Sequence, residues 1–293
     1  MEHALSFRAM DTAVDVLALA PSRPGVLDQV PAIFEDAEQR FSRFRPASLL
    51  SRLNRGETID DPAFASLCRL ALSAFEFTGG LFNPMILPAL ARAGYDQTFA
   101  SITGGELRPA LVPDPRDCLE IRGGHVALRE GQLDLGGIAK GMTVDQAVET
   151  VATSVGPFIV NAGGDLRTHG DEPGGRGWEM VIEHPTAPVS VWQGRVSGAL
   201  ATSTTARRRW TTPSGLAAHH LIDPRTGLPA ESPFVQVSVF AENCWVAEVW
   251  AKAVLVGASP TASLAAAAGN TILAVDQSGG LHEWSPPARE VTG

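Results

Sequence analysis

The apolar and polar positions of this 293-residue chain repeat with two different periods. Strand patterns, some with a period of two and one a short apolar run typical of a buried strand (157–160), occur over residues 4–19, 123–128, 131–135, 157–160, 178–182, 189–192, 195–200, 234–240, 271–275 and 281–284. A period of 3.6, typical of amphipathic helices, occurs over residues 25–40, 62–78, 139–151, 244–256 and 263–268. Because helices and many closely spaced strands are mixed, we expect an α+β fold with mixed, largely antiparallel sheets and packed helices.

Residues that favour caps and turns divide these segments. Ser48 and Asn243 precede helical runs and are predicted N-caps, and Asn54 is placed to end the first of those helices. Glycines predict that residues 170–177 form a hairpin tip, and residues 123–128 and 131–135 are expected to pair as a second hairpin. The polar run at residues 201–205 is expected to be a loop.

Composition limits the class of protein. A hydrophobic content of 44% is enough for a folded core, and a net charge of −9 argues against general binding of nucleic acid. The three cysteines are far apart, which argues against a disulfide framework or a cysteine zinc site. The basic run Arg207-Arg208-Arg209 fits a solvated face, which we favour, or a local phosphate clamp.

No segment reads as a membrane span, and the N-terminal residues show neither a signal peptide nor a lipobox. We therefore expect no membrane insertion and a cytoplasmic location.

The stretch from Leu133 to Asp145, LDLGGIAKGMTVD, combines features of a binding loop. Gly136 and Gly137 permit a tight turn and a close approach to a ligand. The following helix start, with Lys140 beside it, suits an anionic group such as a phosphate. An ordinary strand-to-helix turn would explain the same residues without a ligand. The spacing is neither a Walker loop nor a dinucleotide fingerprint of the G-x-G-x-x-G type.

Several motifs occur in one order: Met10-Asp11-Thr12, FSRFRPASLLSRLN, TGGLFNP, LDLGGIAKGMTVD, VNAGGDL, ATS and HLIDPRTG. This order resembles the ApbE family of FAD:protein FMN transferases, and the resemblance covers nearly the whole chain. It implies an ApbE-like, T-fold-like architecture. Residues 1–293 would form a single flavin transferase domain, or two intimate subdomains with the FAD site between them.

The resemblance also implies the site residues. The FAD site would be formed by Met10, Phe44, Phe82, Asn83, Asp134, Lys140, Gly164, Asp165, Thr202, Ser203 and Leu221. His220 would be the general base, although His219 beside it leaves the register open. In this sequence Phe44 stands where the family has Tyr or Trp, Asn83 where it commonly has Asp, and Asp11 where it usually has Gly.

Members of the family hold Mg²⁺ through a backbone carbonyl, here at about Gly137, and through an Asp and a Thr on a late helix. Glu248 and Lys252 stand at those two places in this chain. A protonated lysine is a donor only and cannot be a Mg²⁺ ligand. Two interpretations stay open: an exposed i,i+4 salt bridge, or an ammonium group that occupies the Mg²⁺ position and faces the FAD pyrophosphate. In the second, Lys252 is a candidate catalytic residue that steadies the phosphates, and one positive charge in place of two preserves dinucleotide binding but weakens catalysis.

The activity implied by the resemblance is transfer of the FMN moiety of FAD to a Thr or Ser hydroxyl of an acceptor protein, with release of AMP. The alternatives are a catalytically impaired FAD-binding protein of the same fold and an FAD pyrophosphatase. FAD and an acceptor protein are the expected partners, and the need for Mg²⁺ is open.

Overall fold

The computed structural model describes residues 3–19 and 25–287. The helices are α1 (Gln29–Phe41), α2 (Leu49–Leu53), α3 (Pro62–Phe77), α4 (Leu87–Arg92), α5 (Pro115–Cys118), α6 (Ala139–Val151) and α7 (Cys244–Ala267). Short 3-10 turns cover Val26–Asp28, Pro84–Ile86 and Phe99–Ser101. The strands are β1 (His3–Ala9), β2 (Thr12–Ala18), β3 (Ile59–Asp60), β4 (Leu119–Arg122), β5 (His125–Leu128), β6 (Phe158–Ala162), β7 (Asp165–His169), β8 (Trp178–Glu183), β9 (Ser190–Val196), β10 (Ala199–Thr204), β11 (Arg209–Thr211), β12 (Ala217–His219), β13 (Ile222–Asp223), β14 (Leu228–Pro229), β15 (Phe234–Ala241), β16 (Thr271–Asp276) and β17 (Leu281–Trp284).

An eight-stranded antiparallel sheet in the order β1-β2-β6-β7-β10-β15-β16-β17 is the centre of the fold. Its register pairs Val14 with Ala162 and Ala201 with both Asp165 and Val239. Alternate side chains point to opposite faces, so Ala201 packs toward the helices while its neighbour Leu200 packs on the other side. The predicted α+β class with antiparallel sheets is therefore confirmed.

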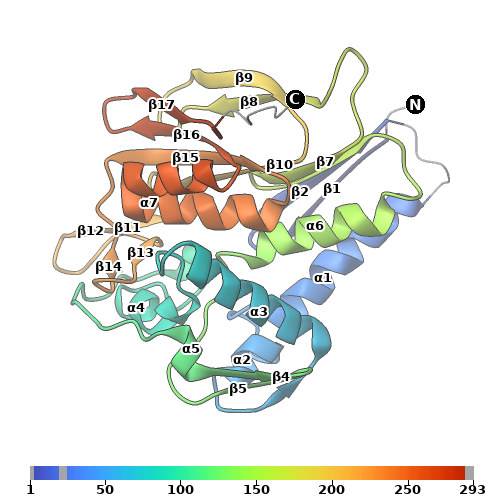
Figure 1. Cartoon of the computed structure of the whole chain (residues 1–293). Coiled ribbons are helices and arrows are strands. Elements are labelled where there is room, and N and C mark those ends of the chain that lie inside the picture. Colours follow the sequence, from blue (N-terminus) through green and yellow to red (C-terminus); the bar gives the residue numbers. More distant parts are fainter. Residues whose placement is uncertain (1–2, 20–24, 288–293) are drawn as a thin grey trace.

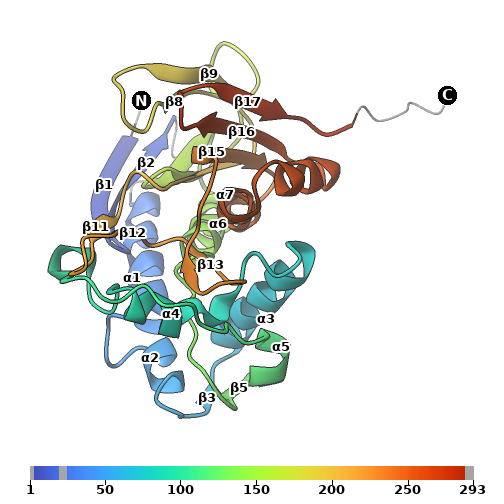
Figure 2. The ribbon, with the colours of Figure 1, turned by 90° about the vertical axis from the view of Figure 1, so that its left-hand side faces the viewer.

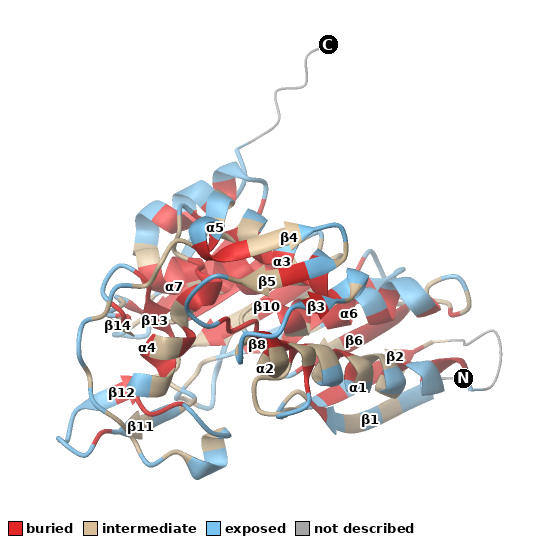
Figure 3. Ribbon diagram, turned by 90° about the horizontal axis from the view of Figure 1, so that it is seen from below, coloured by how far each residue is buried: buried red, intermediate tan, exposed pale blue. Residues whose placement is uncertain are grey.

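Both faces of the sheet are covered. Helices α1, α6 and α7 pack along one face, and the β8–β9 ribbon lies over the other (Figures 1 and 2). Trp178 and Ile182 of this ribbon bury their side chains against Leu166 and Leu200 of the sheet. Below α6 and α7, helices α2 to α5 and the small sheet β3-β5-β4 form a second layer with its own apolar core. Figure 3 shows this layer from below.

Most predicted boundaries agree with the structure within a few residues. Ser48 is the N-cap of α2 and accepts a hydrogen bond from the Ser51 N–H at 3.0 Å, as predicted. Helix α3 begins at Pro62 and has Thr78 as its C-cap. The strand pairs β1–β2, β13–β14 and β16–β17 are antiparallel hairpins.

Three local predictions are wrong. Residues 131–135 are not a strand, because β5 pairs with β4 and β3 instead. Residues 170–177 connect β7 and β8, which belong to different sheets, so they are not a hairpin tip. Most of the polar run 201–205 lies in β10, between β7 and β15, because its small side chains fit a central strand.

The long helix α7 also corrects an expectation. Cys244–Ala267 is long and apolar enough for a membrane span, contrary to our interpretation of the sequence. In the fold, however, much of this helix is buried against β10 and β15. Non-helical torsion angles at Ala258, two residues before Pro260, break it into two parts, which agrees with the two helices predicted there.

Candidate functional site

A cavity of about 460 Å³ is lined by residues of both layers, including Lys140 at the start of α6 and Lys252 in the middle of α7. Its walls come from segments that are far apart in the sequence. Ten predicted site residues line it: Met10, Phe44, Phe82, Asn83, Asp134, Gly137, Lys140, His220, Leu221 and Lys252. The structure therefore brings most of the predicted set to one place.

The loop that precedes α6 is fixed by side chains of the lower layer. Asn54 accepts from the Leu133 N–H at 2.8 Å and donates to the Leu133 carbonyl at 2.9 Å, as a neighbouring strand would. The backbone N–H of Asp134 donates to the Pro84 carbonyl at 2.8 Å. These bonds replace the strand pairing that the sequence predicted for residues 131–135, and they set the position of Asp134 in the cavity wall.

Asp134 forms a buried ion pair. Its Oδ2 lies 2.8 Å from Nε of Arg43, and both side chains are at most a tenth exposed. The Arg43 guanidinium also contacts the faces of Phe44 and Tyr95, at 4.1 and 4.5 Å from the ring centroids. Arg43 and Tyr95 both line the cavity, and the sequence analysis included neither. An arginine next to a predicted aromatic residue was the available signal for Arg43.

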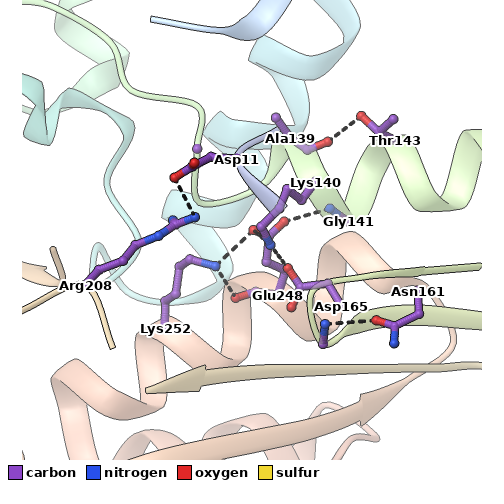
Figure 4. Close-up of polar contacts among 12 residues, drawn as sticks. Asp11, Ala139, Lys140, Gly141, Thr143, Asn161, Asp165, Arg208, Glu248 and Lys252 are labelled. Atoms are coloured by element: carbon purple, nitrogen blue, oxygen red, sulfur yellow. Dashed lines mark hydrogen bonds and ion pairs between the residues drawn. The ribbon is translucent and has the colours of Figure 1, made fainter. Parts of the chain in front are cut away.

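A network of four charged residues closes the inner end of the cavity (Figure 4). Oε1 of Glu248, on α7, lies 3.0 Å from Nζ of Lys252 and 3.3 Å from Nζ of Lys140. Lys140 also forms an ion pair with Asp165 at the start of β7. Glu248 is fully buried, which by itself raises its pKa, but Lys140 and Lys252 outweigh this effect and lower it. The carboxylate is therefore ionised and shared by two ammonium groups.

The Glu248 side chain, from α7, also contacts the start of α6. Its Oε2 accepts from the Gly141 N–H at 2.8 Å. A Cβ on Gly141 would lie 2.6 Å from Cα of Trp245, so only glycine permits this close approach of α6 and α7. One donor at the helix start, which the sequence analysis assigned to an anionic ligand, is thus taken by the protein itself.

The residues at the expected Mg²⁺ position do not fit that ion. Lys252 presents a donor where an oxygen ligand would be needed, and both oxygens of Glu248 already accept hydrogen bonds. Within residues 3–19 and 25–287, no three His, Cys, Asp or Glu side chains form a group that could hold a metal. The aliphatic part of the Lys252 side chain lies close to Gly137, the third expected ligand. A Cβ added to Gly137 would lie 3.4 Å from Cδ of Lys252.

The structure separates the roles of the two adjacent histidines. Nε2 of His219 bonds the Ala230 carbonyl at 3.1 Å, and its Nδ1 accepts from the Leu221 N–H, so this ring is held on both sides. His220 lines the cavity, and its buried Nδ1 has no hydrogen-bond partner among the described residues. Burial, together with the positive charges of Arg208 and Lys252, holds the pKa of His220 well below its usual value. The imidazole is therefore neutral at pH 7.

Besides Glu248, which does not itself line the cavity, four predicted residues lie outside the cavity wall. The Thr202 side chain is on the sheet face that carries Leu200, and its hydroxyl lies 2.8 Å from that of Ser238. Ser203 is buried within β10. Gly164 and Asp165 lie behind Lys140, where the Gly164 N–H donates to Oδ1 of Asn161. Thr202 and Ser203, which the resemblance implied as residues of the FAD site, therefore do not line this cavity.

Asn83 lines the cavity, but its amide is used locally. Oδ1 accepts from the Met85 N–H at 2.9 Å, and Nδ2 donates to the Pro113 carbonyl at 3.1 Å. Asn83 therefore shapes the wall beside Phe82, and one N–H and one oxygen lone pair of its amide are not used by these two bonds.

The arginine run divides between solvent and the cavity. Arg207 and Arg209 are exposed, whereas Arg208 lines the cavity and forms an ion pair with Asp11 at 3.6 Å. The favoured interpretation of a solvated face is thus correct for two arginines and wrong for Arg208. A run of three like residues gives no signal for which one points inward.

Comparisons with known proteins agree with this arrangement. The sequence profile of the ApbE family matches residues 10–274. A protein of Chlamydia muridarum named FAD:protein FMN transferase is 27% identical over 249 residues, which are 77% of this chain and 73% of that protein. A protein of Treponema pallidum with the same name is 28% identical over 78% of this chain and 70% of its own.

Solved structures show the same fold. The ApbE protein of Thermotoga maritima superposes with a TM-score of 0.86 at 23% identity, over 96% of each chain. The flavin transferase ApbE of Vibrio cholerae superposes with a TM-score of 0.76 at 24% identity, over 98% of this chain and 97% of its own.

Proposed function

Because this chain belongs to the ApbE family, we propose that it is a transferase that moves the FMN moiety of FAD to an acceptor protein. Curated relatives that match three quarters of the chain are named for this activity. The observation that carries the proposal is the neutral His220 in the same cavity wall as Lys140 and Lys252. A proton acceptor and two cations face one space, as transfer between a phosphoanhydride and a hydroxyl requires.

The acceptor in this proposal is a Thr or Ser hydroxyl. Its oxygen attacks the phosphorus of the FMN half, the bond from that phosphorus to the bridging oxygen breaks, and AMP leaves with the bridging oxygen. His220 takes the hydroxyl proton, because its imidazole is uncharged and lines the cavity. Lys140 and Lys252 stabilise the negative charge that develops on the phosphate oxygens and on the leaving group.

The second part of the proposal is that the Lys252 ammonium supplies the positive charge that Mg²⁺ supplies in other family members. The Lys252 ammonium, held at 3.0 Å from Glu248, takes the place at which family members hold Mg²⁺. Lys140, Lys252, Asp165 and Glu248 together carry no net charge, so the site does not need a metal to balance two buried carboxylates. Metal-independent binding of FAD follows from this arrangement.

The test is an FAD titration of the purified protein, once with Mg²⁺ and once with EDTA, monitored by flavin fluorescence. We expect the same Kd in both. Binding that disappears in EDTA would overturn the lysine-for-metal assignment while leaving the family activity in place. No binding in either condition would overturn the proposed function itself.

Product analysis then separates transfer from its alternatives. The protein is incubated with FAD and synthetic peptides that each carry one Thr or Ser, and AMP, FMN and flavin-labelled peptide are quantified. We expect AMP and labelled peptide in equal amounts. AMP and free FMN without a peptide would indicate a pyrophosphatase. FAD binding without AMP release from any peptide would favour a binding protein.

A further inference from the structure

A second polar contact crosses the mouth of the same cavity. Nη2 of Arg208 lies 3.6 Å from Oδ2 of Asp11 (Figure 4). Asp11 belongs to the β1–β2 turn, and Arg208 belongs to the segment between β10 and β11. Both side chains line the cavity, and the charge of Arg208 acts on Lys140 and His220 at its inner end. The contact therefore joins two separate parts of the chain next to the reacting groups.

The backbone on both sides of this contact is unusual. Arg208 has φ 48° and Asp11 has φ 59°, and Met10 beside Asp11 has φ 51°. Residues other than glycine rarely adopt this left-handed region, and such residues concentrate at functional sites. At Arg208 the conformation turns the side chain into the cavity, while Arg207 and Arg209 remain exposed. The strained conformation thus gives one arginine of the run a different environment.

The cavity cations differ in how firmly they are held. Arg43 and Lys252 have carboxylate partners within 3.0 Å, and the exposed fraction of each of these four side chains is below a fifth. In the Arg208–Asp11 pair the exposed fractions are 31% and 54%, and the separation is longer. An exposed, long ion pair is weak, and its carboxylate regains water when the pair separates. Among these cations, Arg208 is the one that can change partner most easily.

We propose that Arg208 is a phosphate-binding residue that exchanges Asp11 for a phosphate oxygen when a nucleoside diphosphate or dinucleotide enters the cavity. The identity of the natural ligand as FAD rests on the proposed function. A guanidinium can bind phosphate through two parallel N–H groups, which a single ammonium group cannot do. Arg208 would supply the third positive charge facing the pyrophosphate, after Lys140 and Lys252.

The test compares Arg208→Gln and Asp11→Asn with the matched control Arg207→Gln, which changes an exposed arginine of the same run. Kd is measured by titration calorimetry for three probes: FAD, ADP and riboflavin, of which the last has no phosphate. Arg208→Gln should weaken FAD and ADP binding about ten- to a hundredfold, the size of a lost charge-assisted hydrogen bond. Asp11→Asn should tighten both up to about fivefold, because it frees the guanidinium.

Riboflavin binding and the control variant should match the wild type. Equal weakening by Arg208→Gln and Asp11→Asn would show a merely structural ion pair and overturn the proposal, as would an unchanged Kd for FAD and ADP in Arg208→Gln. Wild-type protein that binds ADP through Arg208 but does not bind FAD would support the phosphate site and overturn only the proposed function.

Discussion

Nζ of Lys252 lies 3.0 Å from Oε1 of Glu248, one helical turn earlier on α7. Pairs of this spacing are common on exposed helix faces, where they stabilise by well under about 1 kcal/mol. Here Glu248 is fully buried and also contacts Lys140, so the pair belongs to an interior network. Of the two interpretations that the sequence left open, the exposed salt bridge is therefore wrong.

Replacing Lys252 should create a metal requirement. Lys252→Thr removes the ammonium and offers a hydroxyl oxygen beside Glu248, which is a better environment for Mg²⁺. We expect the Kd for FAD to rise by about tenfold or more in EDTA, since one charge-assisted contact is lost, and to recover with Mg²⁺. Lys252→Met is the matched control and should bind weakly in both conditions. FAD affinity of Lys252→Thr that stays at the wild-type level with and without Mg²⁺ would contradict the assignment.

His220→Asn should separate catalysis from binding. Loss of a general base lowers turnover by about 10²- to 10⁴-fold. The FAD affinity should change little, because His220 is one of many residues that line the cavity. Rates of AMP release and the Kd for FAD, measured on the same preparation, check this. Retention of wild-type turnover would remove His220 from the mechanism.

The depressed pKa of His220 predicts two pH effects. Because burial and neighbouring cations keep the imidazole neutral, kcat/KM should stay level as the pH falls from 8 through the ordinary histidine value of about 6.5. In the unfolded chain this histidine takes up a proton below about pH 6.5, whereas the folded protein does not. The free energy of unfolding should therefore decrease with falling pH in this range. His220→Asn should show a smaller decrease in urea unfolding at pH 7.5 and 5.5.

The stability of the N-terminal end of α7 should depend on Asp145 and not on Asn243. Asp145 reaches across from α6 and accepts from the N–H groups of Cys244 and Trp245 at 2.9 and 3.0 Å. Asn243 occupies the N-cap position without a side-chain cap bond among the described residues. Asp145→Ala leaves two donors unpaired and should lower the free energy of unfolding by about 2–4 kcal/mol. Asn243→Ala, the matched control, should stay within about 0.5 kcal/mol.

The contributions of Arg43 and Asp134 to the free energy of unfolding should be strongly coupled. Arg43→Met leaves the Asp134 carboxylate, which is about nine-tenths buried, without its cation and should cost about 3 kcal/mol of stability. The double variant Arg43→Met/Asp134→Asn removes both charges and should recover much of that loss. A double variant as unstable as the sum of its single variants would show that the two side chains act independently.

Local sequence patterns predicted most helices and strands, because the period of each element depends on residues that are close together in the chain. The segment 62–78 and the cap at Ser48 are examples. What failed depends on partners that are distant in the chain. Asn54 takes the place of a strand beside Leu133, and Asp145 replaces Asn243 as the cap of α7.

The site residues divide in the same way. Lys140 and Asp134 lie in one continuous motif that the sequence singled out, and both line the cavity. Thr202 was misplaced because the side of a sheet to which a residue points depends on the register with β7 and β15. Arg208 differs from Arg207 and Arg209 in its left-handed backbone and in lining the cavity, and three adjacent identical residues do not encode either difference.

The bond from the Gly141 N–H to Glu248 spans 107 positions of the chain and has a consequence for biosynthesis. A nascent polypeptide that has emerged only as far as α6 lacks the carboxylate shared by Lys140 and Lys252. Non-local contacts of this kind form late, because a long loop must first be closed. FAD should therefore not bind released N-terminal fragments that stop before α7, and its binding would mark the moment at which α7 docks against α6.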